Sequence, residues 1–423
     1  MLRSGDRLEV MIEKPAAGGR MIARHEGQVL LVSGAIPGER VAVRVERVDK
    51  RLAFAEMVEV LTPSPDRRSA TGDPACGGCL FSHIEIGRQR ELKAGIIADA
   101  FARIGKHALA EPPAIAPSPA DGYRMRARLH VRGGSLGFYR EGTHDLCDAA
   151  ATGQLHHATL PAVARVVEGL RALRLEAISV ELAENMAADQ RVLLIETSGT
   201  RRVTAAALEA LLDGDVQSIA IVNAGGSRTV AGSGTIVESL AAITGGRVSG
   251  ELLRHAESFF QGNRFLIAAL VSAVVQSVPP EGDVLDLYAG VGLFALALDE
   301  ARQVVAVEGH PATGADLAAN ARAGGSRVTA VVSPVEQYLT RAGRVPPTVI
   351  ADPPRTGLSR EALAVLVAAA PNRLIYVSCD PATVARDTRV LLDSGYRLLS
   401  VQGFDLFPNT PHIETLAIFD RAS

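Results

Sequence analysis

The regular alternation of apolar and helical segments in the last third of the chain limits its fold more than any other feature. From about residue 281, strand-like apolar runs are separated by stretches of helical character. The predicted strands are 283–288, 303–308, 328–332, 348–352 and 373–379. Because strands that alternate with helices form a parallel sheet covered on both faces, the sequence predicts an α/β domain with a Rossmann-like sheet. Two final strands, 396–401 and 412–419, have no helix between them and predict an antiparallel hairpin at one edge.

A glycine-rich turn follows the first of these strands. Gly290, Gly292 and Ala295 fit the pattern G-x-G-x-x-A, which opens a helix and lets a ligand approach the backbone. Glu308 ends the next strand, where a carboxylate can accept both hydroxyls of a ribose. The pattern alone is compatible with NAD, with S-adenosylmethionine or with a packing turn that binds nothing. Asp286, four residues before the first glycine, favours S-adenosylmethionine.

An aspartate followed by two prolines ends the fourth strand, at Asp352, Pro353 and Pro354. Two prolines make a rigid, extended turn at the carboxyl edge of the sheet, where ligands bind. This feature also favours S-adenosylmethionine. Amino-group methyltransferases usually have an aromatic residue after the prolines, whereas this chain has Arg355, so the sequence argues against methylation of an amine.

Cys379 lies where the fifth strand stops and a helical pattern, 382–394, begins. Asp380 is a natural N-cap for this helix, and Pro381 suits its first turn. The partial positive charge at a helix N-terminus favours a thiolate, but the Asp380 carboxylate opposes it, so the net effect stays open. Taken by itself, a lone cysteine at such a place is more often a buried structural residue.

The N-terminal residues have a different pattern from the last third of the chain. Between residues 5 and 62, short strands at 7–12, 28–32, 40–45 and 53–60 are separated by glycine and proline turns, which predicts a small β-barrel. A linker at 63–66 follows. We therefore expect three domains: a barrel over 1–62, an α+β central domain over 63–264 and the α/β domain over 265–423.

One strand of the central domain carries a stripe of basic residues. Residues 123–132 alternate strictly, and the period of two places five side chains on one face: Arg124, Arg126, Arg128, His130 and Arg132. A solvated strand face would give the same pattern, but four arginines favour contact with RNA phosphates. Since the net charge is −3, any nucleic-acid site must be such a local patch.

Composition narrows the cellular setting. No apolar run reaches the roughly 20 residues of a membrane span, and the N-terminus has no apolar signal region, so we expect a soluble cytoplasmic protein. Four cysteines in 423 residues argue against a disulfide framework. A monomer is the default expectation.

Together, these motifs resemble the RNA uracil-C5 methyltransferases, which form 5-methyluridine in ribosomal and transfer RNA. The matching segments are 259–263, 286–292, 352–355, 378–381 and 412–415. The barrel resembles a TRAM domain, an RNA-binding barrel, through residues 27–29 and 36–41, and Cys76 and Cys79 resemble part of the family's iron–sulfur segment.

The resemblance implies roles for individual residues. By this resemblance, Cys379 is expected to be the nucleophile that adds to C6 of uracil, and Glu414 the base that removes the C5 proton. The residues implied for the pocket that binds S-adenosylmethionine and uracil are Gln261, Tyr288, Gly290, Glu308 and Asp352. The residues expected to contact RNA are Arg124, Arg126, Arg128 and Arg355.

The chain departs from the family pattern at the metal segment. Many relatives carry four cluster cysteines, but here Ala70 occupies the first position and Thr152 the fourth, with Cys147 displaced by five residues. Because a [4Fe-4S] cluster needs three or four thiolates, we expect it to be lost or weakly bound. The alternative is a zinc ion held by Cys76, Cys79, His83 and Cys147. Ser333 and Pro334 also replace the usual Gly-Asp after the third strand, which leaves the adenine contact open.

Other functions compete with this interpretation. An NAD-dependent oxidoreductase would use the same glycine turn, but it needs a second nucleotide-binding half and gives Cys379 and Glu414 no role. An RNA-binding protein with an inactive enzyme domain would explain the missing cysteines, but Cys379 and Glu414 are intact. For the target, the barrel favours 23S rRNA, because bacterial tRNA enzymes of this family usually lack it; a tRNA is the alternative.

Overall fold

The computed structural model describes the whole chain except residues 1, 17, 51, 300–301, 326 and 423. The N-terminal part is a closed five-stranded barrel with the strand order β1-β2-β3-β5-β4. Its strands are β1 (Arg7–Pro15), β2 (Met21–His25), β3 (Gln28–Ser33), β4 (Arg40–Val48) and β5 (Leu52–Thr62). This confirms the predicted barrel. The sequence does not predict β2, because this short strand turns only Met21 and Ala23 into the core.

The C-terminal part is an eight-stranded sheet with the order β18-β17-β16-β19-β20-β22-β21-β6. Its strands are β16 (Val284–Leu287), β17 (Val304–Glu308), β18 (Val328–Val332), β19 (Thr348–Ala351), β20 (Arg373–Ser378), β21 (Tyr396–Phe404), β22 (Glu414–Arg421) and the short β6 (Ile115–Ala116). The strands from β16 to β20 run parallel, and β22 inserts antiparallel between β20 and β21. The α/β fold is thus confirmed. The predicted hairpin exists, but it is not the edge of the sheet, because β6 pairs with β21.

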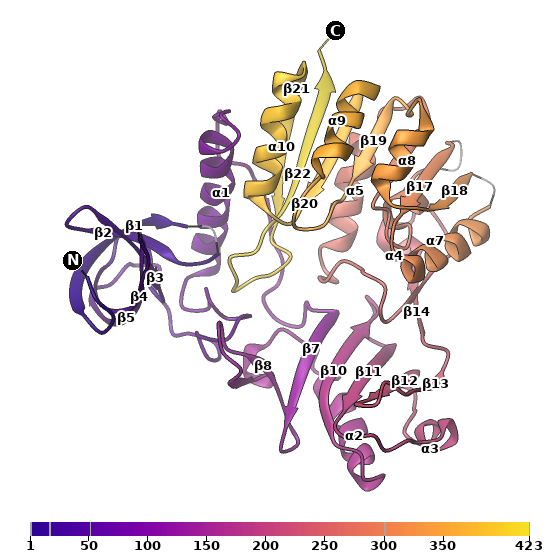
Figure 1. Ribbon diagram of the computed structural model, residues 1–423, viewed down its shortest axis with the longest axis horizontal. Helices are drawn as coiled ribbons and strands as arrows, with labels where there is room; N and C mark the ends of the chain where they lie inside the picture. Colours follow the sequence, from indigo (N-terminus) through magenta and orange to yellow (C-terminus); the bar gives the residue numbers. More distant parts are fainter. Residues whose placement is uncertain (1, 17, 51, 300–301, 326, 423) are drawn as a thin grey trace.

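Helices cover both faces of this sheet, as Figure 1 shows. The helices are α1 (Ile86–Arg103), α4 (Leu240–Thr244), α5 (Ile267–Ser277), α6 (Leu293–Ala297), α7 (Pro311–Ala323), α8 (Val335–Ala342), α9 (Arg360–Ala369) and α10 (Pro381–Asp393). One core contains Val284 of β16 with side chains of α4 to α7, and the other contains Leu285 and Leu287 with side chains of α1 and α8 to α10. The alternation along β16 therefore fills two cores, which explains why its three apolar residues and Asp286 are all buried.

The central part is a seven-stranded sheet with the order β13-β12-β11-β10-β7-β8-β9. Its strands are β7 (Arg126–Arg132), β8 (Ser135–Tyr139), β9 (Leu146–Asp148), β10 (Ala177–Glu184), β11 (Arg191–Thr197), β12 (Ser218–Asn223) and β13 (Arg228–Gly232), with helices α2 (Thr159–Ala172) and α3 (Ala205–Glu209) beside them. A separate ribbon joins β14 (Thr235–Ser239) to β15 (Glu251–His255). The packing crosses the expected boundary at residue 265, since α1, β6 and α4 all belong to the cores of the large sheet.

No helix in the part of the chain that the structure describes is long and apolar enough to cross a bilayer.

Candidate active site

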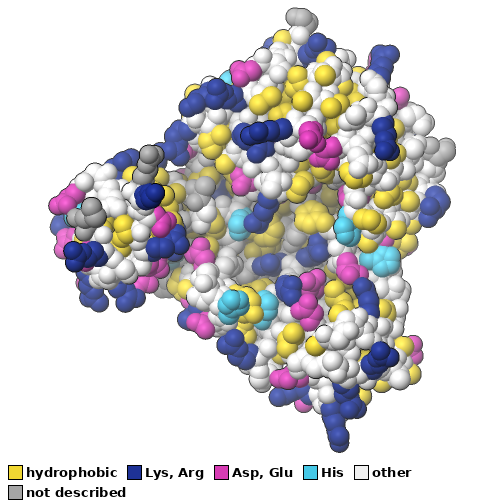
Figure 2. Space-filling view, in the orientation of Figure 1, with side chains coloured by type: hydrophobic (Ala, Val, Ile, Leu, Met, Phe, Trp, Pro, Cys, Tyr) yellow, Lys and Arg dark blue, Asp and Glu magenta, His cyan; other side chains and the backbone are white. Residues whose placement is uncertain are grey.

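A cavity of about 720 Å³ opens at the carboxyl edge of the large sheet, on the side of the central domain. Figure 2 shows the molecule hollowed where its three parts meet, with basic and hydrophobic side chains on the walls. The predicted site residues that line the cavity are Cys379, Glu414, Gln261, Tyr288, Gly290, Glu308, Asp352, Arg124, Arg126 and Arg355. They converge because the carboxyl ends of parallel strands meet at one edge of a sheet. Arg128, Cys76 and Cys79 lie outside this cavity.

Cys379 directly follows β20 and is half-buried. The predicted cap is present: the Asp380 carboxylate accepts hydrogen bonds from the backbone N–H groups of Ala382 (2.8 Å) and Thr383 (3.0 Å) at the start of α10. Burial raises the pKa of the Cys379 thiol to about 11; the charge of Glu414 adds to this rise, and Arg355 opposes it. In the free protein Cys379 is therefore a thiol at neutral pH. Burial outweighs the preference of the helix N-terminus for a thiolate.

Glu414 begins β22 beside Cys379. Ser378 and Thr415 face each other across β20 and β22, so Cys379 and Glu414 occupy the next facing positions at the sheet edge. Glu414 is 4% exposed, and its Oε1 has no hydrogen-bond partner among the described residues. Burial raises the pKa of Glu414 well above its usual value, and the charge of Asp352 adds to the rise while Arg355 opposes it. An unpartnered buried carboxylate beside a thiol can act as a proton acceptor.

The glycine turn after β16 is shaped by backbone conformations that few residues adopt. Tyr288 has φ of 58° and Gly290 has φ of 57°; a non-glycine residue in this region is uncommon. Glu308 holds the turn, since one carboxylate oxygen accepts the N–H of Gly290 (3.0 Å) and the other the N–H of His310 (2.7 Å). Each oxygen keeps a second lone pair, so Glu308 can still accept hydroxyls from a ligand.

Asp286 contacts the helix that follows this turn. It is fully buried in β16, and its Oδ2 accepts the N–H of Ala295 in α6 (3.0 Å), while its Oδ1 has no partner among the described residues. Burial raises the pKa of Asp286 to about 8; the charges of Asp352 and Glu308 add to the rise, and the Ala295 N–H opposes it. Asp286 thus does not line the cavity that its sequence motif suggested, and it fixes the start of α6 instead.

Asp352 and Gln261 form the wall between the turn and the cysteine. Gln261 is 5% exposed, and its Nε2 donates to Asp352 Oδ2 at 3.2 Å. Burial raises the pKa of Asp352 to about 7, against the lowering effect of the Gln261 hydrogen bond.

The sequence did not single out four further residues of the cavity lining: Glu257, His310, Thr313 and Phe407. Phe407 comes from the hairpin loop, for which a single sequence carries no motif.

The basic stripe divides into two groups. Arg124 precedes β7 and donates to Gln154 Oε1 (2.6 Å), and the Arg126 guanidinium lies 5.7 Å from the ring centre of Phe259; both arginines line the cavity. Arg128 is exposed on the sheet and pairs with Glu181 (3.4 Å) of the adjacent β10 and with Glu196 (2.7 Å) of β11, one strand further away. Cross-strand ion pairs of this kind are expected on a solvated sheet face. Arg128 therefore fits the alternative explanation of the alternating pattern, a solvated strand face, whereas Arg124 and Arg126 line the cavity.

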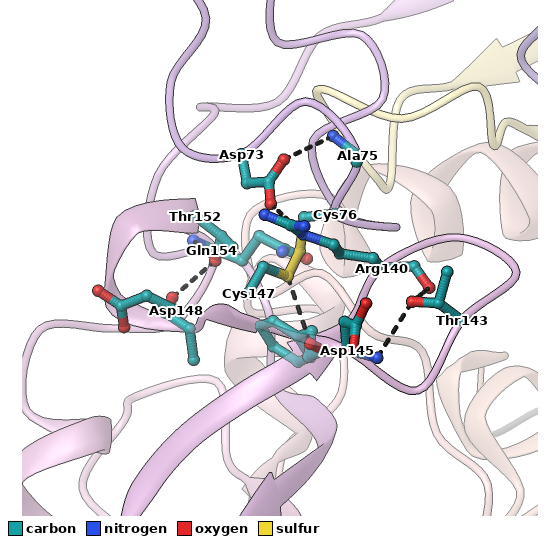
Figure 3. Close-up of a disulfide and its surroundings, with 12 residues drawn as sticks. Asp73, Ala75, Cys76, Arg140, Thr143, Asp145, Cys147, Asp148, Thr152 and Gln154 are labelled. Carbon is teal, nitrogen blue, oxygen red and sulfur yellow. Dashed lines mark hydrogen bonds and ion pairs between the residues drawn. A yellow bond between two sulfur atoms is a disulfide. The ribbon is translucent and has the colours of Figure 1, made fainter. Parts of the chain in front are cut away.

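The cysteine segment contains a disulfide. Cys76 and Cys147, 71 positions apart, are joined with their Cα atoms 5.9 Å apart (Figure 3). Cys79 is a buried free thiol. The zinc set proposed from the sequence is wrong, because two of its thiols are bonded to each other and His83 Nε2 faces the carbonyl of Ala35 at 3.3 Å. Within the described ranges, no group of three His, Cys, Asp or Glu residues could hold a metal ion. The zinc set placed Cys147 near Cys76, but the sequence did not indicate that the two thiols are bonded to each other.

Comparisons with known proteins agree with this geometry. Residues 2–58 match the family model of the TRAM domain, and residues 345–422 match that of tRNA (Uracil-5-)-methyltransferase. The chain is 32% identical to the 23S rRNA (uracil(1939)-C(5))-methyltransferase RlmD of Pseudomonas fluorescens, over 99% of this chain and 93% of that protein. It is also 32% identical to an uncharacterized RNA methyltransferase of Streptomyces avermitilis, over 99% of both chains.

A solved structure has the same fold. The tRNA (uracil-54, C5)-methyltransferase of Pyrococcus abyssi, in complex with S-adenosyl-L-homocysteine, superposes with a TM-score of 0.78 at 24% identity, over 97% of this chain and 99% of that chain. A barrel, a central domain and a class I methyltransferase sheet are thus arranged alike in both proteins. The extent and identity of the match to the Pseudomonas protein establish that this chain belongs to the family of RNA uracil-C5 methyltransferases.

Proposed function

We propose that this protein transfers a methyl group from S-adenosylmethionine to C5 of a uridine in structured RNA through a covalent bond between Cys379 and C6. The observation that carries the proposal is the shared cavity: a thiol, an unpartnered buried carboxylate and a glycine turn with its acidic partner converge on one space. Thiol addition, proton removal and methyl-donor binding each need one of these groups.

The chemistry gives each catalytic residue a defined step. Uracil C5 is a poor nucleophile, but addition of the Cys379 thiolate to C6 turns the ring into an enolate whose electron pair is available at C5. C5 takes up the methyl group with that pair, and the bond between the methyl group and the donor sulfur breaks with its electrons left on the sulfur. Glu414 then removes the remaining C5 proton, the electrons of the C–H bond restore the C5–C6 double bond, and the thiolate leaves.

The cavity suits a cationic methyl donor. Residues that would hold S-adenosylmethionine are Gln261, Tyr288, Gly290, Glu308 and Asp352. The pKa of Asp352 is raised because its carboxylate is buried, so a positively charged ligand would stabilise its ionised form. When bound, S-adenosylmethionine supplies the methyl group, and the protein supplies the position of the acceptor and the route of the proton.

The uracil must leave its base stack to reach Cys379, because the thiol is half-buried in the wall of the cavity. Arg124, Arg126 and Arg355 line the same cavity and could contact phosphates of the extruded nucleotide. The similarity to the Pseudomonas enzyme favours 23S rRNA over tRNA as the target. Arg128 is the weakest of the proposed RNA contacts, since two carboxylates already pair with it.

The test uses RNA that contains 5-fluorouridine, from which no C5 proton can be removed. The wild-type protein with S-adenosylmethionine should form an adduct that survives denaturing electrophoresis. Cys379→Ala should form none while it binds S-adenosylmethionine, in isothermal titration calorimetry, with nearly unchanged affinity. Absence of an adduct with both 23S rRNA and tRNA fragments would refute the proposed chemistry.

The target needs a separate measurement. Mass spectrometry of 23S rRNA and tRNA from a deletion strain should find 5-methyluridine missing from the rRNA alone. Loss from tRNA instead would reassign the substrate and leave the mechanism in place.

A further inference from the structure

The loop between β21 and β22, residues 405–413, delivers two residues to the cavity. Phe407 lies within the loop, and Glu414 comes directly after it. No hydrogen bond from the described residues orients Oε1 of the Glu414 side chain. The position of this carboxylate therefore depends on the backbone that carries it, and hence on what holds the loop.

A buried ion pair holds the beginning of the loop to α1. Lys93 of α1 and Asp405 are both fully buried and pair with each other. Lys93 Nζ also donates to the carbonyl oxygen of Phe407 at 3.1 Å. Asp405 follows Phe404, which is the direct cross-strand partner of Glu414. The pair thus fixes the strand position opposite the proposed base as well as the backbone of Phe407.

A buried glutamine one turn earlier on α1 holds the middle of the loop. Gln89 is fully buried; its Oε1 accepts the N–H of Asn409 (2.9 Å), and its Nε2 donates to Asn409 Oδ1 (3.0 Å). Asn409 has φ of 61°, a conformation that this side-chain pairing supports. The carbonyl of Asn409 accepts the N–H of Phe81, which precedes α1. The backbone and the side chain of Asn409 are thus both hydrogen-bonded to the segment around α1.

These contacts join two segments for which the sequence predicts different domains. α1 lies more than 300 positions before the loop, and Figure 1 shows it beside α10, which begins next to Cys379. Buried polar groups are expected to be paired, but a helix can be packed with apolar residues alone. Here two buried polar side chains of one helix are both directed to the loop of the proposed base.

We propose that Gln89 and Lys93 are positioning residues for the proton-removal step, which hold the loop 405–413 so that Glu414 faces C5 of the bound uracil. The proposal rests on the proposed function and assigns a step to residues outside the cavity. It requires that loosening the loop slows proton removal more than thiol addition, because Glu414 directly follows this loop, whereas Cys379 lies between β20 and α10.

Three variants test this: Gln89→Met, Lys93→Met, and Lys93→Met combined with Asp405→Asn. The double variant lacks the ion pair but leaves neither Lys93 nor Asp405 as a buried charge without its partner, so it should be more stable than Lys93→Met alone. Glu91→Gln is the control, since Glu91 is on the same helix with an exposed side chain that pairs with Arg88. Circular dichroism melts establish that each variant is folded.

Two reactions separate the steps. The adduct with 5-fluorouridine RNA reports thiol addition and methyl transfer, and turnover on ordinary RNA also requires proton removal. We expect adduct formation to stay within about threefold of wild type, while turnover falls about 10- to 100-fold, the loss typical of a misplaced catalytic group. A methylated Cys379 adduct should then accumulate on ordinary uridine RNA, which a general loss of stability would not produce.

Glu91→Gln should match wild type in both reactions. A parallel fall of both reactions in Gln89→Met and in the double variant, or unchanged turnover in both, would overturn the positioning role. If wild type itself forms no adduct with 5-fluorouridine RNA, the proposed function fails and the positioning role fails with it.

Discussion

Asp286 makes the stability of this protein depend on pH in a direction that can be worked out from its surroundings. It is fully buried, one of its oxygens has no hydrogen-bond partner among the described residues, and its pKa rises from 3.8 to about 8. In the unfolded chain the carboxyl loses its proton near its ordinary pKa, whereas in the folded protein it keeps the proton until about pH 8. Unfolding therefore becomes more favourable as the pH rises between these values.

The size of the effect follows from the shift. One pKa unit corresponds to about 1.4 kcal/mol, so the free energy of unfolding falls by roughly 5 to 6 kcal/mol across the whole window. Between about pH 5 and about pH 8, where the protein can be compared directly, the expected loss is roughly 3 to 4 kcal/mol. Asp286→Asn removes the titrating proton and nearly keeps the volume, so it should not show this loss.

The assay is urea unfolding of the ligand-free protein, followed by circular dichroism because the chain has no tryptophan. The quantity is the difference in unfolding free energy between Asp286→Asn and wild type, which cancels most of the titration of the other groups. The difference should grow in favour of the variant from about pH 5 to about pH 8. Asp393→Asn is the control, since this side chain at the end of α10 is 75% exposed. A difference that is constant with pH, or that shrinks, would refute the reasoning.

Three further predictions concern the site and the disulfide. Glu414→Gln should lower turnover about 10²- to 10⁴-fold, the usual contribution of a general base, and should accumulate a methylated adduct on ordinary uridine RNA in denaturing gels; full turnover would exclude Glu414 as the base. Because the Cys379 pKa is raised to about 11, the thiolate fraction grows with pH, so single-turnover adduct formation on 5-fluorouridine RNA should accelerate from about pH 6 to about pH 9, and a flat profile would contradict a rate that depends on thiolate. Cys147→Ser should lower the stability of the oxidised protein by about 4 kcal/mol, because the disulfide closes a loop of 71 positions; in excess reductant, wild type and variant should unfold at the same urea concentration, and a difference that persists there would assign the effect to packing.

The sequence alone located most of the site because the relevant motifs are local. The glycine turn at Gly290, the Asp352 turn and the cap at Asp380 each set the backbone within a few residues, and each follows a recognisable strand. Parallel strands place such ends at one edge, so local motifs predict a common location. The barrel was predictable for a similar reason, since its turns and short strands follow from glycine, proline and alternation.

Other properties were decided by contacts between distant segments. The pairing of Cys76 with Cys147, the carboxylates around Arg128 and the membership of α1 and β6 in the large sheet all depend on which surfaces pack together. The pKa of Cys379 is of the same kind: its helix favours the thiolate, but burial and Glu414 outweigh the helix.

What the sequence by itself determined is the type of fold and the place of Cys379 between a strand and a helix, because these are fixed by hydrophobic period and by turn residues that act within one or two turns of chain. What only the tertiary structure decided is the environment of the site residues: the unpartnered oxygen of Glu414, the raised pKa of Asp286, and the contacts of Gln89 and Lys93 with the loop before Glu414. Burial and pairing depend on neighbours that are far away in the chain, and no local pattern encodes them.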